Sequence, residues 1–304
     1  MAATTGRVAP ARRVSRGVAA DAEQLMSPWL CRLVVAVLAV VVLAPVVYML
    51  LLSLTPNSDV AIGAISFATL SVRNYVDMWS AAPVAAGLLH TLIVAGSAAI
   101  ASVVVGLLAA YPLTRFDFVG RGSYLYTLVA VQTVPGTTLL LPLFAVLSWI
   151  QTTLSVNLIG SFWPIIVTYM TFGVPLSTWL LVSYLRTVPR ELDEAALIDG
   201  CTRLGALRRV MVPIALPAIV AAFVFAFLVG WNDVLFASVF TNDSTQTLAV
   251  TLQRFANTTA SSGIPLYGEL MSAAVVSSVP VVVIYLIVQR FLVHGLGSGS
   301  MTGM

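Results

Sequence analysis

The chain has 304 residues, of which 59% are hydrophobic and only 9% are charged. A soluble domain carries about 25% charged residues, so this composition excludes an ordinary soluble fold and predicts a membrane protein. The net charge is +3, and all 15 basic residues are arginine, because the sequence contains no lysine. Since a phosphate-binding loop needs the lysine of G-x-x-x-x-G-K-[ST], the chain alone is not a Walker-type ATPase.

The first segment, residues 1–32, is rich in Arg, Ala and Ser, and we expect it to be a basic, mobile cytoplasmic arm. It leads into an apolar run that is too long for the hydrophobic part of a signal peptide, which favours an uncleaved anchor. Residues 298–304, at the other end, are expected to form a cytoplasmic tail.

Six apolar runs with almost no charge follow the arm, within a predicted permease domain over residues 33–297. Each run is long enough, at about 1.5 Å per residue, to cross a hydrocarbon core of roughly 30 Å. The sequence therefore predicts an all-α polytopic membrane protein with six transmembrane helices. The predicted spans are Leu33–Leu54, Ala86–Leu113, Tyr124–Ile150, Leu158–Leu185, Ile214–Phe240 and Met271–Val293.

The arginines set the orientation of these spans. Thirteen of the 15 arginines fall on one side, and only Arg73 and Arg254 fall on the other. Because cytoplasmic connections carry the excess of positive charge, both termini are predicted to be cytoplasmic. On the outer side, Pro56–Ala85 and Thr241–Leu270 are predicted loops, large enough to meet a partner delivered from outside.

The cytoplasmic connection between spans four and five, residues 186–213, is predicted to form a rigid elbow. Pro189 breaks the preceding helix, and a short helix starts near Arg190 with acidic residues in its first turn. Gly200 then permits a left-handed turn. A second short helix over Cys201–Val212 is expected to stop at Pro213. Movement of such an elbow would move both adjoining spans.

The same connection carries an ordered pattern: E-A-A, three residues, Gly, nine residues, then aliphatic-x-aliphatic-Pro. This pattern resembles the EAA loop of bacterial ABC importer permeases, in which the loop docks into an ATPase subunit. The resemblance implies that Glu194 pairs with a basic residue of the ATPase. The alternative is an ordinary solvated connector. The residues implied in ATPase coupling are Glu194, Ala195, Ala196, Asp199, Gly200 and Pro213.

Further partial matches in the same order extend the resemblance over nearly all of residues 33–297, to the maltose-type, MalG-like second permease of carbohydrate importers. They include Leu70-Ser71-Val72-Arg73-Asn74-Tyr75, Ala109–Phe116, Gly230-Trp231-Asn232-Asp233 and Gln289–Leu296. The last match implies a tail that contacts the ATPases through Gln289, Arg290 and Gly295. Two departures are His90-Thr91, where the family often has Asn-Ser, and the C-terminal residues 299–304, which lack the usual basic ending.

The resemblance also implies an assembly in the bacterial cytoplasmic membrane. The expected partners are a second, non-identical permease, two ATPase subunits or domains, an extracytoplasmic solute-binding protein, a carbohydrate substrate and membrane lipid, with no nucleic acid. ATP and Mg²⁺ would be used by the ATPase, and no cofactor would be bound by this chain.

A few polar residues lie inside the apolar runs. A charged side chain is energetically costly in an apolar span, so Asp233 is predicted to face the bundle or water. It is either a packing or gating node with Trp231 and Asn232 or a span-end residue. Gln132 and Tyr169 are candidate sugar contacts, because sugars need hydrogen-bonding groups and an aromatic face. Polar packing between helices is the equally open alternative.

The leading hypothesis is therefore a permease subunit that imports a sugar or related polyol compound, driven by partner ATPases. An ion-coupled secondary transporter is the alternative, although it would normally need more intramembrane carboxylates than Asp233. No catalytic residues are assigned, which argues against an intramembrane hydrolase. Cys31 and Cys201 are expected to be free thiols, and His90 and His294 have no metal-site spacing.

Overall fold

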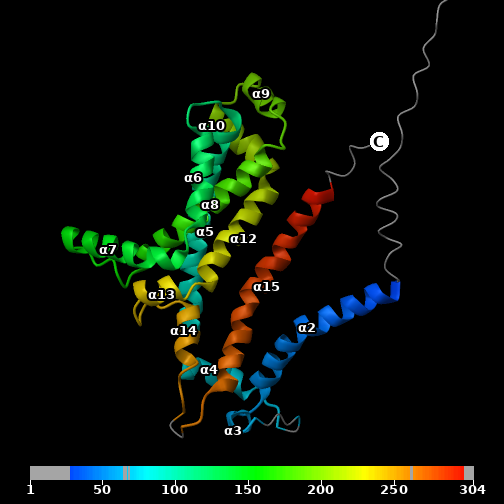
Figure 1. Cartoon of the computed structure of the whole chain (residues 1–304), viewed down its shortest axis with the longest axis vertical. Coiled ribbons are helices and arrows are strands. Elements are labelled where there is room, and N and C mark those ends of the chain that lie inside the picture. The colour runs from blue at the N-terminus through cyan, green and yellow to red at the C-terminus, as the bar shows by residue number, and fades with distance from the viewer. Residues whose placement is uncertain (1–27, 64–66, 68, 261–262, 298–304) are drawn as a thin grey trace, which may run out of the picture. The chain divides into compact units, whose positions relative to one another are not determined.

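The computed structural model describes residues 28–63, 67, 69–260 and 263–297. Within these residues the chain is helical, and the only β-type pairing is an isolated bridge between Thr259 and Pro265. Figure 1 shows the helices in chain order. They are α2 Pro28–Leu54, α3 Asn57–Ala61, α4 Arg73–Ala81, α5 Val84–Arg115, α6 Arg121–Thr133, α7 Gly136–Leu154, α8 Phe162–Leu185, α9 Glu191–Ile198, α10 Arg203–Ala206, the π-helical turn η1 Leu207–Met211, α11 Val212–Ile214, α12 Leu216–Asn232, α13 Leu235–Phe240, α14 Leu248–Phe255 and α15 Tyr267–Gly297.

Five of these helices are long and apolar enough to cross a membrane: α2, α5, α7, α8 and α15. A sixth candidate is the bent pair formed by Arg203–Ile214 and Leu216–Asn232, whose axes differ by 80°. The predicted all-helical membrane fold is therefore confirmed, while the number of crossings and their direction stay predictions.

The chain divides into two compact units. In the first, which ends at Leu51, α2 presents exposed apolar side chains along its length, as expected for a helix in lipid. The second unit, residues 52–304, contains all the packing described below.

Helices α5, α8 and α12 form the centre of the second unit. Small residues let α5 and α8 approach closely: a Cβ added at Gly106 would lie 2.9 Å from Cβ of Ser177, and one added at Gly173 would lie 2.5 Å from Oγ of Ser102. Membrane helices associate through such small residues because lipid offers no hydrophobic drive for pairing.

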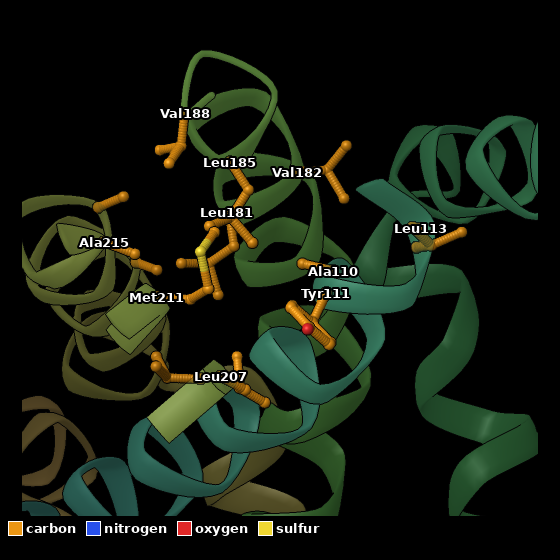
Figure 2. Close-up of a cluster of buried hydrophobic side chains, with 13 residues drawn as sticks. Ala110, Tyr111, Leu113, Leu181, Val182, Leu185, Val188, Leu207, Met211 and Ala215 are labelled. Atoms are coloured by element: carbon orange, nitrogen blue, oxygen red, sulfur yellow. The ribbon is translucent and has the colours of Figure 1, made fainter. Parts of the chain in front are cut away.

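At the end of this bundle next to α9, a buried apolar cluster joins α5 and α8 to the turn η1 (Figure 2). Met211 of η1 is completely buried and belongs to this cluster with Leu181 and Leu185 of α8. Ala110 and Tyr111 contribute from α5. The segment that follows α9 is therefore packed against two membrane-spanning helices.

The third predicted span, Tyr124–Ile150, is two helices in the structure. Helix α6 ends at Thr133, Val134 is extended with ψ of 121°, and α7 begins at Gly136. Pro135 explains the break, because proline lacks an N–H and pushes the preceding residue out of the helical conformation. Figure 1 shows α7 turning away from the direction of α6 and α8.

The fifth predicted span, Ile214–Phe240, also divides. Helix α12 ends at Asn232, Asp233 is extended with ψ of 128°, and α13 follows. The carboxylate of Asp233 accepts hydrogen bonds from the backbone N–H groups of Phe236 and Ala237 at 3.4 and 2.9 Å. These bonds satisfy free N–H groups at the start of α13 and stabilise the interruption.

The two predicted outer loops contain short helices of their own. Helix α4 is held by Asn74, which is buried and donates hydrogen bonds of 2.9 Å to the carbonyl oxygens of Ser53 and Thr55. Helix α14 is held by Thr91 of α5, whose hydroxyl accepts a 2.7 Å hydrogen bond from the N–H of Leu248. These segments are ordered by packing that the sequence pattern does not reveal.

Candidate functional site

The predicted elbow between spans four and five is present. Helix α8 ends at Leu185, before Pro189, and α9 begins at Glu191 with three acidic residues in its first turn. Gly200 follows α9 with φ of +84°, a left-handed conformation that side chains resist. No neighbouring atom of the described residues lies within 4 Å of where its Cβ would be, so the backbone conformation, and not a lack of space, is the reason for glycine at this position.

The second helix of the elbow differs in detail from the prediction. It begins at Arg203 after Thr202, whose hydroxyl caps it by accepting a 3.1 Å hydrogen bond from Gly205 N–H. The π-helical turn η1 and then α11 continue it to Ile214, so it does not stop at Pro213. Pro213 lies in the first turn of α11, where proline is tolerated, and the chain bends at Ala215.

Helix α9 is fastened to α5 by a buried acid. Asp193 is only 3% exposed, and its carboxylate accepts hydrogen bonds of 2.9 and 3.0 Å from the hydroxyl of Tyr111. Arg115 Nε lies 3.9 Å from the same carboxylate, and its NH1 group donates to the carbonyl oxygen of Val188 at 3.2 Å. Asp193 therefore joins the connecting helix to the end of a membrane-spanning helix.

The opposite face of α9 is open. Glu194, Ala195 and Asp199 are exposed, whereas Ala196 is buried beneath them. Ile198 is 87% exposed, and Leu204 of α10 is 66% exposed. A short helix that presents acidic groups, a small residue and large apolar side chains offers a surface suited to another protein.

A second feature is a cavity of about 400 Å³ at the break between α6 and α7. It is lined by Gln132, Tyr169 and Asp233, so three residues that the sequence singled out separately lie together. The hydroxyl of Tyr169 donates a 2.9 Å hydrogen bond to Asp233. Phe172 and Phe236 supply aromatic walls.

The close approach of Tyr169 to Asp233 depends on Gly230. A Cβ at this position would lie 2.8 Å from the ring of Tyr169 and 2.9 Å from Cβ of Ala95. Gly230 thus lets α12 pack against α5 and α8 where the tyrosine meets the acid.

The two residues that precede Asp233 in the sequence, Trp231 and Asn232, do not line this cavity. Trp231 is buried in the apolar cluster that includes Phe227 and packs against its ring at 5.3 Å between centroids. Asn232 is exposed, and its amide donates a 3.0 Å hydrogen bond to the carbonyl oxygen of Leu228. The geometry therefore separates both residues from the Tyr169–Asp233 pair.

The predicted ATPase-contacting tail is part of α15. Gln289 is exposed, the backbones of Arg290 and Gly295 continue the helix, and the side chain of Arg290 lies outside the described part. The predicted N-terminal arm, up to residue 27, and the tail 298–304 also lie outside the described residues.

Sequence reasoning gave no separate role to Tyr111 and Arg115, which hold Asp193. The available signal was their spacing, because residues four apart at the end of a helix share one face. What the sequence lacked was the partner, since Asp193 is 82 residues from Tyr111.

Residues 102–298 match the family described as the binding-protein-dependent transport system inner membrane component, and the match covers more than half of the chain. The chain belongs to this family. It is therefore an inner membrane permease subunit, and the resemblance drawn from the EAA loop is confirmed. The alternative of an ion-coupled secondary transporter is not supported.

Several curated relatives are similar over most of the permease. SmoH of Agrobacterium fabrum, a sulfoquinovosyl glycerol transport system permease protein, is 32% identical over 86% of this chain and 89% of its own. SugB of Mycobacterium tuberculosis, a trehalose transport system permease protein, is 32% identical over 86% and 93%. MalG of Escherichia coli, a maltose/maltodextrin transport system permease protein, is 30% identical over 73% of each chain.

A solved structure shares the fold of the permease. It is a crystal structure of a bacterial ABC transporter involved in the import of the acidic polysaccharide alginate, with a TM-score of 0.70 and 17% sequence identity. The match covers 86% of this chain and 94% of that one. At this identity the likeness concerns the fold and not the solute.

Proposed function

We propose that this permease carries a sugar or a related polyol compound into the cytoplasm as one subunit of an ATP-driven importer. The named relatives belong to transport systems for sulfoquinovosyl glycerol, trehalose and maltose or maltodextrin, all of which are rich in hydroxyl groups. The partners are a second, non-identical permease, two ATPase subunits or domains and an extracytoplasmic solute-binding protein. ATP and Mg²⁺ belong to the ATPase, and this chain contributes no chemical step.

The observation that carries the proposal is the construction of the elbow. Its inner face is fixed to α5 through Asp193, and its outer face leaves Glu194 and Ile198 exposed. Movement of an ATPase bound to the outer face would move α5 and, through the cluster around Met211, also α8. This coupling would bias the bundle between two orientations of the transport path.

The cavity at Gln132, Tyr169 and Asp233 is proposed to lie on the transport path. Its hydroxyl, amide and carboxylate groups can exchange hydrogen bonds with solute hydroxyls, and Phe172 and Phe236 can contact C–H surfaces. Six crossings with both termini in the cytoplasm complete the proposal, with α12, the second member of the bent pair, in the fifth crossing. The arginine distribution supports this orientation.

Reversing the charge of Glu194 tests the docking face. In the complex purified with its ATPase, Glu194→Lys should release the ATPase or uncouple ATP hydrolysis from transport, because the introduced lysine would repel the basic residue that pairs with Glu194. Asp77→Lys is the matched control, since Asp77 is also partly exposed and lies on α4, far from α9 in Figure 1. Equal ATPase retention together with equally coupled ATP hydrolysis in wild type and Glu194→Lys would contradict the proposed docking.

The solute class is tested in vesicles that contain the complex and its solute-binding protein. Trehalose, maltose or a glycosyl glycerol should stimulate ATP hydrolysis, whereas an amino acid of similar size should not. Transport at full rate without any ATPase would instead favour the ion-coupled alternative.

A further inference from the structure

A second polar cavity, of about 480 Å³, lies where the start of α9 meets the ends of α5 and α8. Its lining includes four arginines, Arg115, Arg121, Arg186 and Arg190, and a single acid, Glu191. The four guanidinium groups come from three separate segments of the chain, so folding gathers them. Even with Glu191 ionised, the lining side chains carry an excess of positive charge.

Two of these guanidinium groups, those of Arg186 and Arg190, make few or no hydrogen bonds within the described residues. Arg121 pairs with Asp117 at 2.6 Å, and Arg115 faces Asp193. Arg186, in contrast, is exposed, and its guanidinium group makes no polar contact with the part of the chain that the structure describes. Arg190 uses one nitrogen in a long 3.4 Å hydrogen bond to the carbonyl oxygen of Thr114.

Arg115 adds an independent indication of an incomplete polar site. It lines the cavity, its side chain is only 4% exposed, and its Nε atom has no hydrogen-bond partner within the described residues. The Asp193 carboxylate, at 3.9 Å, is too far from this atom for a hydrogen bond. A buried donor without an acceptor is costly, and an anion in the cavity would offset the excess positive charge of the lining arginines, Arg115 included.

We propose that this cavity binds a phosphate group. Paired guanidinium forks match the oxygen geometry of phosphate. The site supplies the fork of Arg186, which is uncommitted within the described residues, and that of Arg190, which makes one long hydrogen bond. The cavity lies at the ends of α5 and α8, two candidate membrane spans, and phospholipid headgroups lie at the ends of membrane spans. The phosphate comes either from an anionic lipid headgroup or from a soluble phosphate.

A bound phosphate would also act on the elbow. Arg115 lines the cavity, and its Nε atom also lies 3.9 Å from the Asp193 carboxylate of α9. Occupancy would therefore hold the base of α9 more firmly against α5. Phosphate binding itself does not depend on which solute the permease carries.

The test uses the purified, delipidated importer complex and measures two probes separately. Phosphatidylglycerol in mixed micelles, compared with phosphatidylcholine, is followed by native mass spectrometry, and inorganic phosphate is followed by calorimetry. The double variant Arg186→Gln/Arg190→Gln should bind whichever probe binds to the wild type roughly tenfold or more weakly than the wild type does, because two charge-assisted contacts are lost. Arg208→Gln/Arg209→Gln removes the same charge outside the cavity and should bind like wild type.

The outcomes separate the two sources. Binding of phosphatidylglycerol that inorganic phosphate does not displace identifies a lipid headgroup, and binding of inorganic phosphate alone identifies a soluble ligand. If the glutamine variant fails to assemble, Arg186→Lys/Arg190→Lys replaces it, and loss of the guanidinium fork should still weaken binding several-fold. Equal binding in the cavity and control variants, or no binding of either probe, overturns the proposal.

Discussion

The carboxylate of Asp193 lies between a tyrosine and an arginine of α5, and all three side chains are buried. Burying an ion pair costs solvation free energy, which the pair recovers only with good geometry and additional hydrogen bonds. Tyr111 supplies such hydrogen bonds to both carboxylate oxygens. At the residue scale, the position of α9 therefore depends on a polar network and not on apolar contact alone.

Removal of the tyrosine hydroxyl tests this network. We expect Tyr111→Phe to destabilise the attachment of α9 by about 1.5–3 kcal/mol, the usual contribution of a hydrogen bond to a charged group. Tyr184→Phe is the control, because its hydroxyl donates to the neutral carbonyl oxygen of Ile214 at 3.1 Å and should contribute only about 1 kcal/mol. Tryptic cleavage within residues 186–209 of the purified complex measures local opening. Equal cleavage rates in the two variants would contradict a special role for Asp193.

At the scale of elements, local signals predicted the elbow well. Pro189 and Gly200 mark its turns through their own backbone restrictions, which act whatever packs around them. The break at Pro135 was harder to predict, because Pro112, Pro142 and Pro175 lie inside intact helices. Membrane helices tolerate proline when neighbouring groups satisfy the freed backbone, and the sequence of one helix does not show its neighbours.

The residues of the cavity at the break between α6 and α7 show the same limit of prediction from sequence. Gln132, Tyr169 and Asp233 were identified separately as polar residues in apolar runs, and packing brings them to one place. Trp231 and Asn232 were grouped with Asp233 because they are adjacent in sequence. Successive residues of a helix point in directions about 100° apart, so adjacency did not place them on the same face.

The α5–α8 contact gives a prediction at this scale. Gly106→Val should destabilise the bundle by at least about 1–3 kcal/mol, because the added carbons would overlap Ser177 and the backbone of Thr178. Gly96→Val is the matched control on the same helix, since no neighbouring atom in the described part of the chain lies within 4 Å of its added Cβ. The thermal stability of the two detergent-solubilised variants checks this expectation. Similar losses in both would show that α5 and α8 do not rely on small residues at this contact.

For the whole molecule, the arginines on the two predicted sides of the membrane differ in their partners as well as in their number. On the predicted outer side, Arg73 pairs with Asp77, and Arg254 pairs with Asp243. On the predicted inner side, Arg186, Arg208 and Arg209 have no polar partner among the described residues. Uncompensated positive charge is therefore gathered at the end that holds α9, which is the arrangement that retains a segment in the cytoplasm.

Cysteine labelling tests the resulting topology without disturbing any arginine. In a Cys31→Ser/Cys201→Ser background, Val76→Cys on α4 places one thiol on the predicted outer side, and Val119→Cys before α6 places one on the predicted inner side. The two valine side chains are well exposed, at 69% and 105%. A membrane-impermeant maleimide should label position 76 in intact spheroplasts and position 119 only after permeabilisation. The opposite pattern would put α9 outside the cell, where no cytoplasmic ATPase reaches it. Because Val119 lies between Arg115 and Arg121, the same experiment fixes the side of the membrane on which the arginine-lined cavity opens.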